Sequence, residues 1–209
     1  MIIRISTITI LFLTGLAFSV AAQDSEPPAT TLDATSIKLK LYKFAVSANA
    51  DCTNATTVFE SAVGIESDML TSPTFGKGKI PSGTYRCIMI EVSKLMNTAA
   101  GGTCTTPKNN LLCADAQQSK LVDGSNVTCS GGTSNDQKVV LYFTTLSAGN
   151  TGTRALLPPT NSSDTTSGMV LSNPIVFPTN KKAILRIVKQ MISSVNCNSA
   201  TPTISISVP

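Results

Sequence analysis

Residues 36–47, SIKLKLYKFAVS, decide the fold class of this chain. Ile37, Leu39 and Leu41 alternate with lysines, which is the two-residue period of a strand that buries one face. After Leu41 the apolar residues fall on the other parity, beginning with Tyr42. A shift of one residue turns every later side chain to the opposite face of a sheet. We therefore expect a β-bulge, or a crossing between two sheets, near Leu41 and Tyr42.

Further strands follow along the chain. Residues 84–92 (TYRCIMIEV) are apolar on both faces up to Glu91, which is typical of a central strand. Residues 138–144 (KVVLYFT) have strand composition, and residues 203–208 (TISISV) alternate without a break. Many strands and at most one helix predict an all-β antiparallel β-sandwich with loop insertions.

One segment, residues 181–195, is ambiguous. Its apolar residues recur with the spacing of an amphipathic helix: Ile184, Ile187, Val188, Met191, Ile192 and Val195. Its many β-branched residues and the flanking prolines favour a strand instead. Periodicity alone favours the helix.

The N-terminus predicts export. Arg4 precedes an apolar run over residues 8–18, and small residues follow, so residues 1–22 are typical of a cleavable signal peptide. The run is shorter than the 18 or more residues of a membrane-spanning helix, which is the alternative, and no later segment is apolar enough to span. Residues 23–35 are expected to form a flexible linker before a single domain over 36–209. The predicted location is secreted, periplasmic or on the cell surface.

Two polar stretches are expected to be loop insertions: residues 97–136, the first loop region, and residues 147–170, the second loop region. Behind an export signal, six cysteines indicate up to three disulfides, against the alternative of reduced thiols. The six are Cys52, Cys87, Cys104, Cys113, Cys129 and Cys197. Six cysteines allow 15 pairings. Our hypothesis pairs Cys104 with Cys113 as a local loop, Cys52 with Cys197, and Cys87 with Cys129. The close cysteine pairs of a zinc site are missing.

The composition excludes several chemistries. The chain has no His, so catalysis by a Ser-His-Asp triad or a Cys-His pair is excluded. The sequence contains no nucleophile elbow and no phosphate-binding glycine loop. Among the few acids, Glu91 is notable because it lies in a central strand. The net charge is only +4 and the lysines are scattered, so nucleic acid is not an expected partner. We predict no enzyme activity, no catalytic residues, no cofactor and no metal.

The order of these pieces resembles the secreted bacterial β-sandwich modules of unknown function with a prealbumin-like fold. Four features carry the resemblance: IKLKLYKFAV at 37–46, IPSGTY running into CIMIEV at 80–92, NPIVF at 173–177 followed by AILRIV, and a last strand ending in ISISV. The resemblance implies that residues 183–188 form a strand, and it leaves room for one short helix near 188–195. The resemblance implies the architecture, a β-sandwich of the immunoglobulin or prealbumin type, and no activity.

The function expected from these observations is binding or adhesion through the two loop regions, since binding residues concentrate on loops held by a rigid scaffold. The expected partner is a surface protein or a glycan. Most aromatic residues lie within strand patterns, so an aromatic platform for sugars is not expected. Asn54, Asn126 and Asn161 open N-x-Ser/Thr sequons, which matter only in a glycosylating host. The alternative is a structural subunit that self-associates by exchange of its terminal strand, residues 203–208.

Overall fold

The computed structural model describes residues 31–70, 78–132, 136–149, 153–178, 184–189, 191–193 and 203–207. In this part of the chain the secondary structure consists of strands and two 3₁₀ turns. The longer strands are β1 (Thr31–Ser47), β2 (Thr56–Asp68), β4 (Cys87–Ala100), β8 (Lys138–Thr144), β11 (Ile184–Lys189) and β13 (Thr203–Ser207). The shorter elements are β3 (Gly83–Tyr85), η1 (Gly102–Cys104), β5 (Lys108–Leu111), β6 (Gln118–Lys120), β7 (Asn126–Thr128), η2 (Thr153–Leu156), β9 (Met169–Val170), β10 (Ile175–Phe177) and β12 (Met191–Ser193).

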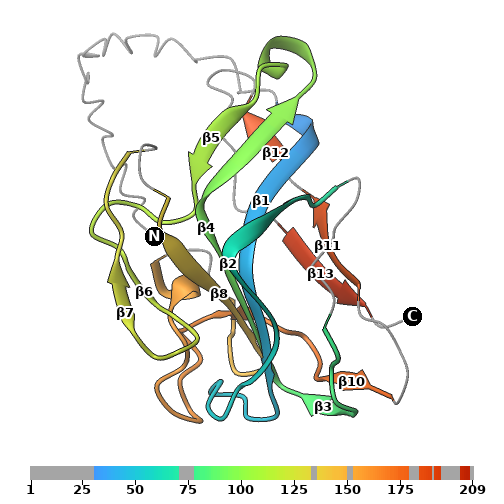
Figure 1. Ribbon diagram of the computed structural model, residues 1–209, viewed down its shortest axis with the longest axis vertical. Helices are drawn as coiled ribbons and strands as arrows, with labels where there is room; N and C mark the ends of the chain where they lie inside the picture. The colour runs from blue at the N-terminus through green and yellow to red at the C-terminus, as the bar shows by residue number, and fades with distance from the viewer. Residues whose placement is uncertain are drawn as a thin grey trace, which may run out of the picture.

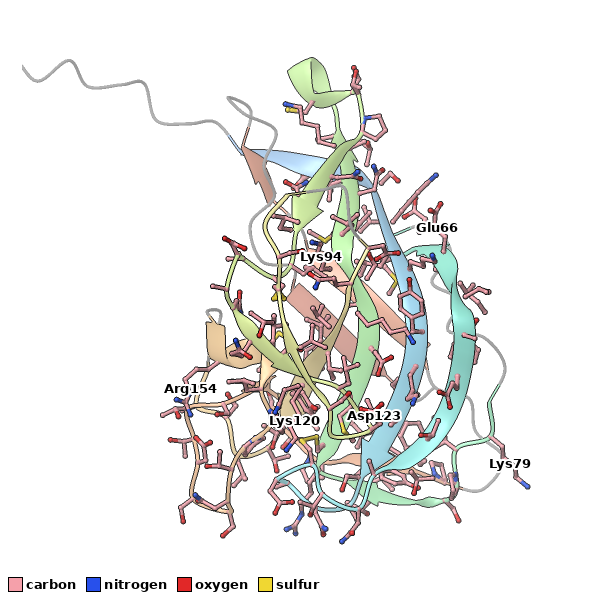
Figure 2. All side chains as sticks on the ribbon, turned by 60° about the vertical axis from the view of Figure 1, so that its left-hand side comes forward. Glu66, Lys79, Lys94, Lys120, Asp123 and Arg154 are labelled. Atoms are coloured by element: carbon pink, nitrogen blue, oxygen red, sulfur yellow. A yellow bond between two sulfur atoms is a disulfide. The ribbon has the colours of Figure 1, made fainter. Side chains whose placement is uncertain are left out.

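Seven strands form one large sheet. Its central path runs β12-β1-β4-β8-β9, with β2 beside β1 and β5 beside β4. The pairs are antiparallel except for the short contact of β8 with β9. Three two-stranded sheets, β3–β10, β6–β7 and β11–β13, surround it. Figures 1 and 2 show β6–β7 on one side of the large sheet and β11–β13 on the other. The fold is thus an all-β sandwich, as predicted from the sequence.

The expected irregularity in the first strand is present. The pairing of β1 with β2 and with β4 shifts register between Leu41 and Lys43. Before the shift, Leu41 faces the main core, and after it Phe44 does so. The bulge therefore lets both halves of one long strand bury their apolar residues on the same face.

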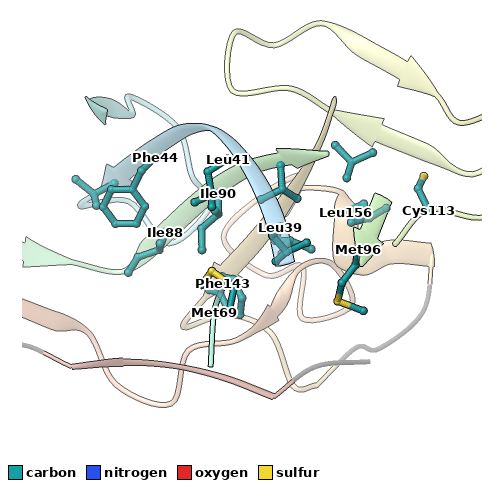
Figure 3. Packing of buried hydrophobic residues seen from close by; sticks show 14 of the residues in the cluster. Leu39, Leu41, Phe44, Met69, Ile88, Ile90, Met96, Cys113, Phe143 and Leu156 are labelled. Atoms are coloured by element: carbon teal, nitrogen blue, oxygen red, sulfur yellow. The ribbon is translucent and has the colours of Figure 1, made fainter. Parts of the chain in front are cut away.

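The main core lies on one face of the large sheet. Alternate residues of β1, β4 and β8 supply it, and Figure 3 shows several of them, including Leu39, Leu41, Ile90 and Phe143. The opposite face carries a second, smaller cluster around Met89, Val140 and Tyr142. Because β4 is apolar on both faces and pairs with strands on both edges, it is the central strand that its sequence predicts.

Two predicted boundaries are wrong. β1 begins at Thr31, so residues 31–35 belong to a strand and not to the linker predicted over 23–35. β4 continues to Ala100, inside the first loop region, because its second half pairs with β1 and β5. The signal peptide predicted for residues 1–22 lies outside the described residues.

The ambiguous C-terminal segment forms strands where the structure describes it. β11 pairs with β13, and β12 pairs with the start of β1. The helical spacing therefore misleads, and the short helix allowed near 188–195 is wrong over Met191–Ser193. Backbone pairing with distant strands outweighs the local periodicity, and the β-branched residues of the segment suit it.

The disulfides correct the predicted pairing. Cys52 bonds Cys87 and Cys113 bonds Cys129, with Cα–Cα distances of 5.2 and 6.1 Å. All three hypothesised pairs are therefore wrong: Cys104–Cys113, Cys52–Cys197 and Cys87–Cys129. Cys104 is also disulfide-bonded, whereas Cys197 lies outside the described residues.

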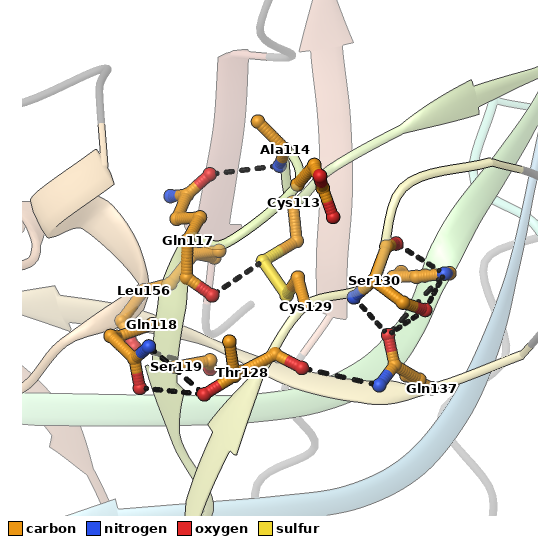
Figure 4. The surroundings of a disulfide bond; sticks show 12 residues. Cys113, Ala114, Gln117, Gln118, Ser119, Thr128, Cys129, Ser130, Gln137 and Leu156 are labelled. Carbon is orange, nitrogen blue, oxygen red and sulfur yellow. Dashed lines mark hydrogen bonds between the residues drawn. A yellow bond between two sulfur atoms is a disulfide. The ribbon is translucent and has the colours of Figure 1, made fainter.

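Strand pairing explains both observed bonds. Ser47, the last residue of β1, pairs with Cys87, the first residue of β4, so the short loop after β1 returns Cys52 to the same place. Cys113 and Cys129 flank the β6–β7 hairpin, and Figure 4 shows the disulfide between them. The backbone hydrogen bonds of the hairpin bring its two ends together.

Candidate binding cleft

A cleft of about 810 Å³ opens on the face of the large sheet that carries the smaller cluster. Three segments wall it: residues 51–55 after β1, residues 120–124 at the β6–β7 turn, and residues 157–160 after η2. Met89 and Tyr142 lie at its floor, both nearly fully buried. Figure 2 shows Lys120 and Asp123 in front of the large sheet on this side.

The first wall is held by covalent and polar bonds. The Cys52–Cys87 disulfide ties it to β4, and the Thr144 hydroxyl of β8 donates to the backbone oxygen of Ala50. Cys52 and Asn54 adopt left-handed backbone angles, with φ of 65° and 52°. Residues other than glycine rarely adopt this backbone conformation unless the surrounding structure fixes it. The wall is therefore a defined loop.

The second wall is the turn of the β6–β7 hairpin. Asp123 accepts hydrogen bonds from the backbone N–H and the hydroxyl of Ser125, at 2.9 and 2.6 Å. These bonds lower the pKa of the Asp123 carboxyl. The Tyr142 hydroxyl donates to the backbone oxygen of Lys120 at 2.7 Å, which joins the hairpin to the sheet. Burial, together with the charges of Glu91 and Asp123, raises the pKa of Tyr142, so this phenol stays a neutral donor.

The third wall is organised around one carboxylate. Asp164 accepts hydrogen bonds from Thr160, Thr166 and Ser167, and Arg154 lies 3.7 Å from it. The pKa of Asp164 is strongly lowered, first by the backbone N–H of Thr160 and then by the hydroxyl of Thr166. The Asp164 side chain is only 7% exposed. Its role is to shape the loop, because its oxygens are turned to its own segment.

The acid that the sequence singles out, Glu91, lies beside this cleft and is paired. Its side chain is 4% exposed and its Oε1 is 3.4 Å from Nζ of Lys138. Lys43, which lines the cleft, is paired with Glu60 at 3.0 Å. In the described part of the chain, no group of three or more His, Cys, Asp and Glu side chains is placed to hold a metal ion.

Both predicted loop regions contribute to the cleft. Residues 120–124 come from the first, and Arg154, residues 157–160 and Ser167 come from the second. The sequence reasoning missed the wall at 51–55, although its polar run DCTNA, which follows a strand and contains a cysteine, is a signal of a fixed turn. Asn54, Asn126 and Asn161 of the sequons are exposed.

Comparison with known proteins adds no assignment: no protein family, curated protein sequence or solved structure matches this chain. The prealbumin-like resemblance therefore stays a prediction. Among the residues described, none forms a helix with the length and hydrophobicity that crossing a bilayer requires.

Proposed function

We propose that this chain is an exported, non-enzymatic binding protein whose recognition site is the cleft over Met89 and Tyr142. The observation that carries the proposal is the convergence of both loop regions on one hollow of about 810 Å³. That volume falls in the range of pockets that hold small ligands or short polymer segments. The disulfides Cys52–Cys87 and Cys113–Cys129 support an oxidising compartment, and the predicted signal peptide supports export.

The rigidity of the walls supports the same proposal. A disulfide, a hairpin and a hydrogen-bonded carboxylate fix the three walls independently of one another. A site that is ordered before binding loses little conformational entropy when a ligand enters. A surface protein or a glycan remains the proposed partner.

The test fills the cleft. Thr57 of β2 is exposed and lines the hollow, so Thr57→Trp places a large ring there without removing a core contact. The matched control is Val176→Trp, because Val176 is 59% exposed and is not among the lining residues. Labelled protein is applied to a peptide array and a glycan array. We expect Thr57→Trp to lose the binding that wild type and Val176→Trp share; equal binding by all three contradicts the proposal.

Self-association by strand exchange is the second prediction from the sequence. In the structure β13 pairs with β11 of the same chain, from Ile184↔Ser207 to Lys189↔Thr203. Light scattering of the exported protein tests exchange directly. A monomer contradicts it, and a polymer that disappears on truncation after Thr201 supports it.

A further inference from the structure

The charged side chains that line the cleft differ in whether they have an ion-pair or hydrogen-bond partner within the protein. Asp51 accepts two hydrogen bonds from Thr53, and Asp123 accepts two from Ser125. Lys43 has Glu60 as its partner. The Arg154 guanidinium donates to Thr166 and Ser167 and lies 3.7 Å from Asp164. Both cations thus have carboxylate partners within the protein, and both carboxylates, which keep their negative charge, accept hydrogen bonds within their own loops.

Lys120 is different. Its backbone oxygen accepts the Tyr142 hydroxyl at 2.7 Å, and its backbone pairs with Asn126 across the hairpin. The residue is therefore fixed in place at the rim of the cleft. Within the described part of the chain, its ammonium group has no carboxylate within ion-pair distance and no hydrogen-bond acceptor. Among the described residues that line the cleft, Lys120 is thus a positive charge without a partner, and its backbone is held by the hairpin and by Tyr142.

The surroundings of Lys120 are partly apolar. Leu121, Val122, Leu157 and Pro158 line the same hollow, and each is only partly buried. A ligand that fits this surface offers an anionic group to Lys120 and apolar groups to its neighbours. Acidic side chains and terminal carboxylates of a peptide form charge-assisted hydrogen bonds with an ammonium group, and neighbouring residues supply the apolar contacts.

A glycan fits the same surface less well. Sugars are held by stacking on exposed aromatic rings, and the aromatic residue that lines the cleft, Tyr142, is 2% exposed. Its hydroxyl is already engaged with Lys120. The lining therefore favours a peptide.

We propose that the cleft recognises a carboxylate-bearing peptide segment through the unpartnered ammonium of Lys120. The inference rests on the proposed function of the cleft and adds the class of ligand and the residue that selects it. The proposed ligand is an extended acidic segment of a partner protein.

The test is a reversal of specificity. Labelled full-length chain is applied to an array of random dodecapeptides in two sets, one amidated so that only side chains carry carboxylates, the other with free C-termini. We expect Asp and Glu to be enriched among amidated peptides that bind wild type. If the terminal carboxylate is the group recognised, only the free set shows binding that depends on Lys120.

Lys120→Glu is the decisive variant. In the described structure the Lys120 ammonium group makes no ion pair or hydrogen bond that the change would break. The variant is expected to exchange the preference for acidic residues with one for Lys and Arg. Lys120→Ala is expected to weaken binding of acidic peptides by about fivefold, the upper range for a solvent-accessible ion pair. Lys79→Glu is the matched control, because Lys79 is exposed and lies far from Lys120 in Figure 2. It should leave the preference unchanged.

The outcomes separate the two proposals. Peptide binding that Thr57→Trp abolishes, but that shows neither a preference for acidic residues nor a dependence on Lys120 in the set with free C-termini, overturns the role of Lys120 and leaves the cleft as the binding site. Binding only on a glycan array, again lost in Thr57→Trp, overturns the peptide class. No binding that depends on the cleft in either array overturns the proposed function itself.

Discussion

The two loop regions are both ordered around the cleft, but different interactions hold them. The first closes on itself through the Cys113–Cys129 disulfide and is anchored to β4 by a buried lysine, Lys94. In the second, hydrogen bonds hold the described residues, and five of these bonds are accepted by the single carboxylate of Asp164. The first region should therefore respond to reduction, and the second to pH.

Lys94 stands where β4 changes partner. Residues before it pair with β8, and residues after it pair with β5. At this fork three acceptors face inward, the backbone oxygen and hydroxyl of Ser130 and Oε1 of Gln137. The Lys94 ammonium group donates to all three, at 2.8, 3.2 and 3.3 Å, and the side chain is fully buried. Buried polar groups are costly unless they are paired, so the lysine and its acceptors stabilise one another.

The largest effect is expected from Lys94→Ala. The change leaves a cavity and an unpaired backbone oxygen at Ser130, so the free energy of unfolding should fall by about 3–5 kcal/mol. Denaturant unfolding measures it. Lys94→Met keeps the packing of the side chain and separates the cavity from the lost hydrogen bonds. Lys79→Ala, on the surface, should stay near wild type. If Lys94→Ala lowers the free energy of unfolding as little as Lys79→Ala does, Lys94 does not anchor the first loop region to β4.

The next largest loss in the free energy of unfolding is expected when the Cys113–Cys129 disulfide is removed by substituting both residues with Ala. The bond closes a loop with a sequence separation of 16. Loop-closure entropy predicts a loss of about 3 kcal/mol. Hydrogen exchange should accelerate in the first loop region and change less in the second. Equal acceleration in both would show that the two regions open as one unit.

A smaller effect tests the contact between the regions. Ser119 of β6 donates to the backbone oxygen of Leu156 at 3.2 Å and accepts the N–H of Val140 at 3.1 Å. Ser119→Ala leaves both buried groups unpaired and should cost about 1–3 kcal/mol. Ser163→Ala is the control, because Ser163 is exposed and only its backbone is bonded. If hydrogen exchange in the second loop region is unchanged in Ser119→Ala, the Ser119 contact does not couple the stability of the two loop regions.

Features that depend on neighbouring residues in the chain could be predicted from the sequence, and features that depend on distant residues could not. The bulge near Leu41 was predictable from alternation and the strand at 138–144 from its composition, because both are local properties of the sequence. The extension of β4 to Ala100 was not, because residues 97–100 take strand conformation from their pairing with β1 and β5. The disulfide pairing depends on which strands are neighbours, which spacing along the chain does not encode. The same holds for Lys94, whose acceptors lie at least 36 residues away.

The smallest and most selective effect concerns pH. Hydrogen bonds, the first from the backbone N–H of Thr160, lower the pKa of Asp164 in the folded state. A carboxyl with a lowered folded pKa contributes stability above its unfolded pKa of about 3.9 and loses it as the pH falls below that value. Asp164→Asn should therefore melt below wild type at pH 7, and the gap in melting temperature should narrow below about pH 4. The disulfide does not titrate, so the gap of the Cys113→Ala/Cys129→Ala variant should persist across the same pH range. If both gaps narrow alike, acid weakens the whole sandwich, and the second loop region has no pH dependence of its own.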